Sequence, residues 1–204
     1  MSYFEYGFSH TKEYHDLKNI YTNYSKRPNI KFNVFQGDIT TGINWIWAEN
    51  TNTLNYFTKF INSININNMM VNISNDKFIV RGASFITIDH NIVNNSDFHY
   101  DVISQCDSDD ETNILTIIFP LYKLEENMGH LEYKKNDETK IYNYDVHKLI
   151  IWDSCKFLHR TQPYVIKEPK QRVLVSINLS TNKKWAVDAV NNCLRYQGNL
   201  LWID

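Results

Sequence analysis

The stretch DFHYDV, residues 97–102, contains two side chains, His99 and Asp101, from which we interpret the rest of this sequence. His99 and Asp101 lie two positions apart in a segment, residues 98–103, whose composition predicts a strand. Successive side chains of a strand point to opposite faces, so His99 and Asp101 point the same way. An imidazole and a carboxylate on one face can supply two ligands of a metal site. His159 is the candidate for the third ligand.

Two histidines and one carboxylate leave three coordination positions of a metal open, which is the ligand set of non-haem Fe(II) oxygenases. A His-x-Asp pair alone is a weak signal, because a chain with 7 histidines and many aspartates contains such pairs by chance. A surface His and Asp on an edge strand is the alternative. The surrounding sequence therefore has to decide between the two interpretations.

A series of short strands surrounds this pair. Strand patterns recur at residues 77–88, 113–122, 129–133, 141–144, 148–152 and 172–180. Residues 172–180 alternate between an apolar face and a second face that is made of Arg172, Leu174, Ser176 and Asn178. About eight short strands in series predict a double-stranded β-helix, a cupin-like jelly roll whose interior can hold a metal and a small ligand.

Helical spacing of apolar residues precedes and follows the strands, at residues 11–24, 52–64 and 182–196. The predicted fold class is therefore mainly β with flanking helices. At 204 residues the chain fits a single domain, residues 1–204. We expect an N-terminal helical support region (1–76), a jelly-roll core (77–180) and a C-terminal helix (181–204).

Composition narrows the function classes. The net charge of −2 and the lack of a basic patch disfavour a nucleic-acid partner. The 3 cysteines are scattered without a CxxC pair, which supports neither a zinc ribbon nor a disulfide framework and favours a reducing compartment. No signal peptide and no transmembrane stretch is apparent, so we expect a cytoplasmic protein without a membrane partner. The acidic residues 107–111 predict a solvated loop, with a mobile lid beside the site as the alternative.

The order of these elements resembles the catalytic core of the Fe(II)- and 2-oxoglutarate-dependent dioxygenases over residues 77–180. The family pattern is His-x-Asp, then a distal His, then an Arg or Lys on the last core strand. His99, Asp101, His159 and Arg172 match it in order. GHLEY at 129–133 resembles the short Gly-led strand of the family, LIIWD at 149–153 the apolar strand before the distal His, and HRTQP at 159–163 its His-x-x-x-Pro turn.

The resemblance implies an enzyme that holds Fe(II) on His99, Asp101 and His159. It implies 2-oxoglutarate and O2 as cosubstrates, release of succinate and CO2, hydroxylation of a substrate, and ascorbate as an accessory reductant. Arg172 would bind the distal carboxylate of 2-oxoglutarate, because a guanidinium pairs bidentately with a carboxylate and keeps its charge when buried. A surface salt bridge is the alternative for Arg172.

Two details of the pattern refine this expectation. Many members carry Ser two positions after the Arg, where this chain has Leu174. The second contact to 2-oxoglutarate must come from elsewhere, and Thr116 and Ser176 are the candidates. Halogenating members lack the carboxylate ligand, so Asp101 favours hydroxylation. The Arg at position 172 also disfavours the Jumonji branch, which uses a Lys on another strand.

Substrate identity is less defined. Candidate substrate contacts are Arg81, Ser84, His130 and Glu132, although exposed strand positions explain them equally well. The short chain favours a small molecule or an amino-acid-like substrate. The same chemistry on a protein side chain or a methylated nucleic-acid base is the alternative, and a non-catalytic jelly-roll binding protein is the alternative of another class. The sequence leaves the oligomeric state open.

Overall fold

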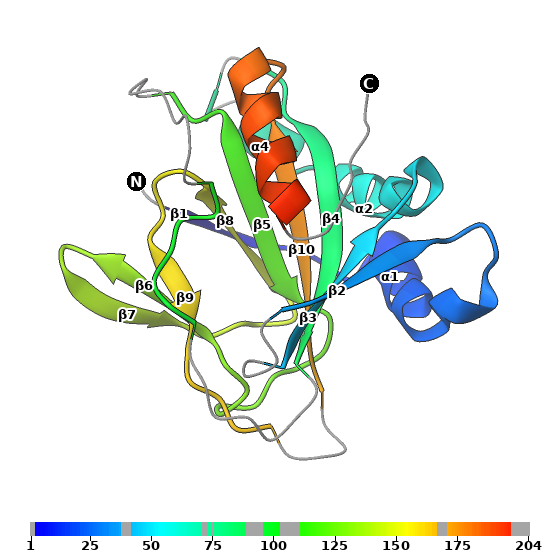
Figure 1. The fold of residues 1–204 in the computed structure, drawn as a ribbon, viewed down its shortest axis with the longest axis horizontal. Helices are drawn as coiled ribbons and strands as arrows, with labels where there is room; N and C mark the ends of the chain where they lie inside the picture. Colours follow the sequence, from blue (N-terminus) through cyan, green and yellow to red (C-terminus); the bar gives the residue numbers. More distant parts are fainter. Residues whose placement is uncertain are drawn as a thin grey trace.

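The computed structural model describes residues 3–37, 42–70, 73–74, 76–88, 96–102, 111–166 and 171–196. Two antiparallel sheets pack against each other through a shared apolar interior (Figure 1). The larger sheet has the strand order β1-β8-β5-β10-β4-β3-β2 and the smaller sheet the order β7-β6-β9. This architecture is the double-stranded β-helix that the sequence predicts, mainly β with flanking helices.

The bounds of β4, β5, β8 and β10 follow the sequence patterns at residues 77–88, 113–122, 148–152 and 172–180 closely, whereas β6 and β7 are shifted by two or three residues from the patterns at 129–133 and 141–144. The large sheet contains β1 (Tyr3–Gly7), β2 (Phe32–Gln36), β3 (Ile43–Ala48), β4 (Ile79–Ile88), β5 (Ile114–Pro120), β8 (Lys148–Asp153) and β10 (Arg172–Ser180). The small sheet contains β6 (Leu131–Lys135), β7 (Glu138–Tyr142) and β9 (His159–Thr161). The turn between β6 and β7 places Asn136 and Asp137 at φ values of 51° and 64°, a backbone conformation that Asn and Asp adopt more readily than most residues.

Two helices cover the outer face of the large sheet, opposite the small sheet (Figure 1). In α1 (Lys12–Asn23) the side chain of Thr11 accepts a hydrogen bond from the backbone N–H of Tyr14. In α2 (Thr51–Ser63) the cap is Asn50, which accepts from the backbone N–H of Thr53 at 2.9 Å. The helix thus begins one residue before the predicted range of 52–64. The remaining helical elements are η1 (Tyr24–Lys26), α3 (Asn67–Met70) and α4 (Lys184–Tyr196).

Strand β10 divides the molecule into an outer core and an inner cavity. Its odd-numbered positions, Val173, Val175, Ile177 and Leu179, are buried in the core that the large sheet forms with α1 and α2. Its even-numbered positions, Arg172, Leu174, Ser176 and Asn178, line the cavity between the two sheets. The predicted alternation of residues 172–180 is thus confirmed. Full burial of each aliphatic side chain contributes roughly 1.5–3 kcal/mol, so the outer core holds this strand in place.

Helix α4 closes one end of the interior. Its buried side chains Ala186, Val190 and Leu194 pack against Trp47 and Val102. The apolar stripe that the sequence shows on this helix is therefore core packing for the most part. Cys193 and Leu194, at its C-terminal end, also line the cavity.

The first 76 residues contribute more strand than the sequence pattern indicated. Strand β1 pairs with β8, and β3 pairs with both β2 and β4. Strands β1 and β2 are therefore the two edges of the large sheet. The patterns at residues 32–35 and 45–48 fit short strands and turns equally well, and the structure makes both of them strands, β2 and β3. The longer helices α1 and α2 have a clearer pattern.

The strand predicted over residues 98–103 is a single bridge among the described residues. His99 and His159 exchange two backbone hydrogen bonds, N–H to O, at 2.9 and 3.0 Å. Asp97 and Tyr100 on either side of His99 are exposed and extend no ladder. The prediction was therefore wrong about the extent of pairing. A single bridge forms at His99 alone, so the neighbouring residues need not pair or be buried.

Other expectations concern the thiols and the acidic loop. Cys155 is engaged in a disulfide and Cys193 is a free thiol, whereas we expected reduced cysteines.

In the part of the chain that the structure describes, no helix has the length and apolar character needed to cross a bilayer. Of the acidic residues 107–111, only Glu111 is described, and it pairs with Lys183 at 2.5 Å. The proposed lid otherwise lies outside the described residues.

Candidate metal centre

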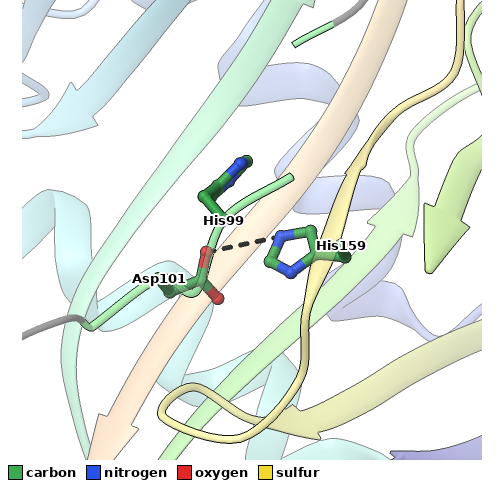
Figure 2. A group of neighbouring side chains, drawn as sticks. All are labelled: His99, Asp101 and His159. Carbon is green, nitrogen blue, oxygen red and sulfur yellow. Dashed lines mark ion pairs between the residues drawn. The ribbon is translucent and has the colours of Figure 1, made fainter. Parts of the chain in front are cut away.

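Three ligand-bearing side chains converge at one point of the interior. The ligand atoms of His99, Asp101 and His159 all lie within 4.8 Å of one another. In Figure 2 the carboxylate of Asp101 faces the ring of His159, with Oδ1 of Asp101 3.5 Å from Nε2 of His159, and His99 lies next to this pair. The backbone bridge between His99 and His159 brings together segments that are distant in sequence. His159 is buried and His99 is exposed, so the site is open on the His99 side.

Both imidazole rings are oriented in the same way, by a hydrogen bond between Nδ1 and a backbone carbonyl oxygen. Nδ1 of His99 lies 2.8 Å from the carbonyl oxygen of Asp97, and Nδ1 of His159 lies 3.0 Å from that of Phe157. A carbonyl oxygen only accepts, so Nδ1 carries the proton in each ring and Nε2 keeps a free lone pair. This second hydrogen bond is the arrangement that metal-ligating histidines use to set their tautomer.

Asp101 is held by one oxygen and leaves the other available. Its Oδ2 accepts hydrogen bonds from Thr116 Oγ1 at 2.6 Å and from Trp152 Nε1 at 2.7 Å. The Thr116 hydroxyl also lies 2.8 Å from that of Ser154, which fixes its position on β5. Oδ1 faces His159 and is free to bind a metal in a monodentate manner.

Burial determines the charge state of the distal histidine. Removal from water lowers the pKa of His159, and the nearby Asp101 carboxylate opposes this shift. Burial prevails, so His159 is neutral at pH 7. A neutral imidazole is the form that binds a metal.

Arg172, the first residue of β10, is a buried cation. Its side chain is 2% exposed, and Nε and Nη1 lack hydrogen-bond partners among the described residues. The guanidinium carbon lies 5.9 Å from the centre of the Tyr144 ring, and none of the ion pairs between described residues includes Arg172. Burial lowers the pKa of Arg172 while Tyr144 opposes the shift. A buried charge without a counter-charge is costly, so this position fits an anionic ligand.

One cavity contains both the candidate metal ligands and Arg172. It has a volume of about 350 Å³ and is lined by Arg172 and by the candidate metal triad, His99, Asp101 and His159. Thr116 and Ser176, the predicted second contacts to 2-oxoglutarate, also line it. The rest of the described wall is largely apolar and includes Ile43, Trp45, Trp47, Ile86, Ile118 and Leu174. The arrangement can hold a metal at one place and a carboxylate at another.

The four predicted substrate contacts lie elsewhere. Arg81 donates to Ser180 Oγ at 3.0 Å and to Asn182 Oδ1 at 2.7 Å, which ties β4 to the end of β10. Glu132 pairs with Arg160 at 2.6 Å, and this pair sits at alternate positions to the cavity-facing Leu131 and His159, hence on the outer face of the small sheet. Neither Arg81 nor Glu132 is part of the described cavity wall.

His130 and Ser84 are also outside the described wall. Nδ1 of His130 accepts the backbone N–H of Tyr144 at 3.0 Å, so this ring supports the segment that carries Tyr144. Ser84 is fully buried, and its hydroxyl has no partner among the described residues. A substrate role for these residues remains a prediction.

Sequence reasoning missed Tyr144, Trp152, Trp47 and Asn178. Trp152 was recognised only as part of an apolar strand, although its indole N–H orients a metal ligand. Tyr144 lies beside Arg172, and burial raises its pKa to about 12, so its hydroxyl stays protonated. The sequence does not show whether the polar atom of a Tyr or Trp is buried in the core or contributes to a binding site.

No protein-family model and no curated protein matches this sequence. Solved structures share its fold. A prolyl-4-hydroxylase of Pseudomonas putida has a TM-score of 0.59 and 10% identity, with 89% of this chain and 94% of that chain covered. The non-haem α-ketoglutarate-dependent epimerase SnoN from nogalamycin biosynthesis has a TM-score of 0.65 and 8% identity, with 88% and 78% covered.

A third solved structure was obtained with ligands. HygX of Streptomyces hygroscopicus, with nickel and 2-oxoglutarate bound, has a TM-score of 0.60 and 6% identity, and 89% of this chain and 83% of that chain are covered. At these identities the likeness establishes the fold alone.

Proposed function

We propose that this chain is an Fe(II)- and 2-oxoglutarate-dependent oxygenase that hydroxylates a small molecule or an amino-acid-like group, with release of succinate and CO2. The observation that carries the proposal is the buried guanidinium of Arg172, which lies in the same cavity as His99, Asp101 and His159 and has two nitrogens, Nε and Nη1, without a hydrogen-bond partner among the described residues. A binding protein without turnover would need neither an open metal site nor a separate cation for a carboxylate. The alternative of the same chemistry on a macromolecule rests on no observation within the described residues.

The residues that would hold the metal are suited to Fe(II). Two imidazoles present Nε2, and one carboxylate presents Oδ1, which together form the two-histidine, one-carboxylate set. When bound, iron with 2-oxoglutarate supplies the activation of O2 that hydroxylates a C–H bond. The protein keeps the three ligands in one orientation through the carbonyls of Asp97 and Phe157 and the donors Thr116 and Trp152.

The other residues of the cavity bind and orient the cosubstrate. Arg172 would pair with the distal carboxylate of 2-oxoglutarate, with the Tyr144 hydroxyl beside it. Leu174 and Ile86 form an apolar wall that excludes water from the hydrocarbon part. Thr116 donates its hydroxyl proton to Asp101, so we favour Ser176 over Thr116 as the further polar contact.

Anaerobic titration of the Fe(II)-loaded protein with 2-oxoglutarate tests the proposal. We expect the weak visible charge-transfer band of the chelate in the wild type and its loss in His159→Ala, which removes a metal ligand. Arg172→Met should keep the metal but require at least ten times more 2-oxoglutarate, because a charge-assisted pair is lost. The ligand-free Arg172→Met protein should also unfold at higher urea, since an uncompensated buried charge is removed.

The outcomes separate the parts of this proposal. A wild type that binds no Fe(II) would refute the metal centre. A band that forms at the same 2-oxoglutarate concentration in Arg172→Met would refute the role of Arg172 while leaving the metal centre intact.

A further inference from the structure

The cavity contains a second set of unpaired polar atoms, apart from Arg172. Nε1 of Trp47 and Oδ1 of Asn178 are both inaccessible to water and have no hydrogen-bond partner among the described residues. Trp47 is 2% exposed, and both residues line the cavity. A buried polar group without a partner is destabilising, so native proteins rarely leave one without a ligand or a function.

Strand register places these two atoms at the end of the cavity opposite Arg172. Trp47 on β3 lies opposite Ser84 on β4, which lies opposite Ser176 on β10. Asn178 is the next inward-facing position of β10, opposite Thr116. Arg172 is three inward-facing positions away on the same strand. The end near Trp47 is also the end where α4 covers the interior.

The amide of Asn178 has a defined orientation. Thr116 donates its only hydroxyl hydrogen to Asp101, so its oxygen can only accept from Asn178. The Nδ2 of Asn178 lies 3.4 Å from that oxygen, which is a weak hydrogen bond. Oδ1 of Asn178 is therefore the atom left without a partner among the described residues.

The charge of the cavity wall limits what can bind there. Among the described residues that line the cavity, Asp101 and Arg172 are the charged ones, and the metal and the cosubstrate account for both. The wall near Trp47 includes Trp45 and Leu194. An ionised group in this part would be buried without a counter-charge, which is strongly unfavourable.

We propose that Trp47 and Asn178 form the subsite for the primary substrate, and that its occupant is a neutral, mainly hydrocarbon group with a hydrogen-bond acceptor for Trp47 and a donor for Asn178. This inference rests on the proposed function and adds the class of substrate. A cavity of about 350 Å³ is at the lower end of the range for small-molecule sites and must also hold 2-oxoglutarate. The buried part of the substrate is therefore compact.

Three probes on one hydrocarbon framework test the class. Phenylacetamide is neutral with an acceptor and a donor, phenylacetate is an anion, and phenethylamine is a cation. Each is titrated into the anaerobic Fe(II) protein at saturating 2-oxoglutarate, which occupies Arg172, and binding is followed by broadening of the probe's proton NMR signals. We expect phenylacetamide to bind at least ten times more tightly than either charged probe. Equal binding of the three, preference for a charged probe, or no binding of phenylacetamide would overturn the proposal.

Single substitutions test the residues. Trp47→Phe removes the N–H and keeps an aromatic ring, and we expect it to weaken phenylacetamide binding about three- to tenfold, the usual effect of one hydrogen bond. Asn178→Ala should weaken it to a similar degree and serves if Trp47→Phe fails to fold. Trp185→Phe on α4, outside the cavity wall, is the matched control and should bind like the wild type. Unchanged binding in both Trp47→Phe and Asn178→Ala would refute the subsite.

The two proposals can fail separately. If the protein binds neither Fe(II) nor 2-oxoglutarate, the proposed function fails. Phenylacetamide titration of the metal-free wild type and metal-free Trp47→Phe then still tests the subsite. If iron and 2-oxoglutarate bind but phenylacetamide does not, the subsite assignment fails and the proposed function stands.

Discussion

At the scale of single residues, the properties of the candidate metal centre depend on atoms that are not ligands. Asp101 can offer one oxygen to a metal because Thr116 and Trp152 hold the other. The histidines offer Nε2 because two backbone carbonyls hold their Nδ1 atoms. Substitution of such supporting residues typically costs 10–100-fold in metal affinity.

Trp152→Phe should therefore weaken Fe(II) binding by about 10–100-fold while all three ligands remain. The reason is that Oδ2 of Asp101 loses its indole donor and the carboxylate can rotate. Anaerobic competition with a chelator of known affinity measures the effect. Trp185→Phe, which removes a half-buried indole of α4 that is not part of the described cavity wall, is the control. Equal affinities in the wild type and Trp152→Phe would contradict the supporting role.

At the scale of elements, β10 serves two purposes through its two faces. The outward face is part of the core under α1 and α2, whereas the inward face presents Arg172 to the cavity. Because neighbouring residues of a strand point to opposite sides, stability and ligand binding depend on different residues of the same strand.

Ile177→Ala should consequently lower the free energy of unfolding by about 2–5 kcal/mol, and Ile177→Val by about 0.5–1.5 kcal/mol. Ile177 is fully buried on the outward face. Urea unfolding measures stability, and 2-oxoglutarate titration of the folded variants should give the wild-type affinity. A loss of 2-oxoglutarate affinity in Ile177→Val would show that the two faces are not independent.

At the scale of the whole molecule, buried neutral histidines link stability to pH. His130 accepts a backbone N–H through Nδ1, and burial together with the charge of Arg172 lowers its pKa. In the unfolded chain a histidine has a pKa of about 6.5. The unfolded state therefore binds more protons than the folded state below that pH, and stability falls as the pH decreases through 6.5.

We expect the free energy of unfolding of the metal-free protein to decrease between pH 7 and pH 5.5. His130→Asn should reduce the slope, because the Asn oxygen can accept the same N–H and does not titrate. Urea unfolding at a series of pH values gives both slopes. Identical slopes for the wild type and His130→Asn would exclude His130 as a source of the pH dependence.

The residues of the candidate site are brought together by the fold of the whole molecule. The ligands come from the segment around His99 and from β9, the supporting donors from β5 and β8, and the cation from β10. Each of these segments is short. Their mutual position depends on pairing between strands that are far apart along the chain.

The sequence by itself determined the alternation of residues 172–180, the helices α1 and α2, and the chemical types of the candidate ligands. These features depend on local periodicity and on residue chemistry, both of which a single chain displays. The resemblance to a known family added their expected order. The identity of Arg172 as a cation on the inward face followed from its parity with Leu174 and Ser176.

Only the tertiary structure decided which polar residues face the cavity. Arg81 and Glu132 are satisfied elsewhere by Ser180 and Arg160. Nε1 of Trp47 and Oδ1 of Asn178, in contrast, have no hydrogen-bond partner among the described residues, and both residues line the cavity. The single bridge between His99 and His159 and the edge strand β1 likewise had no clear local pattern. The physical reason is that hydrogen-bond satisfaction and burial depend on partners distant in sequence, which become defined only when the sheets pack.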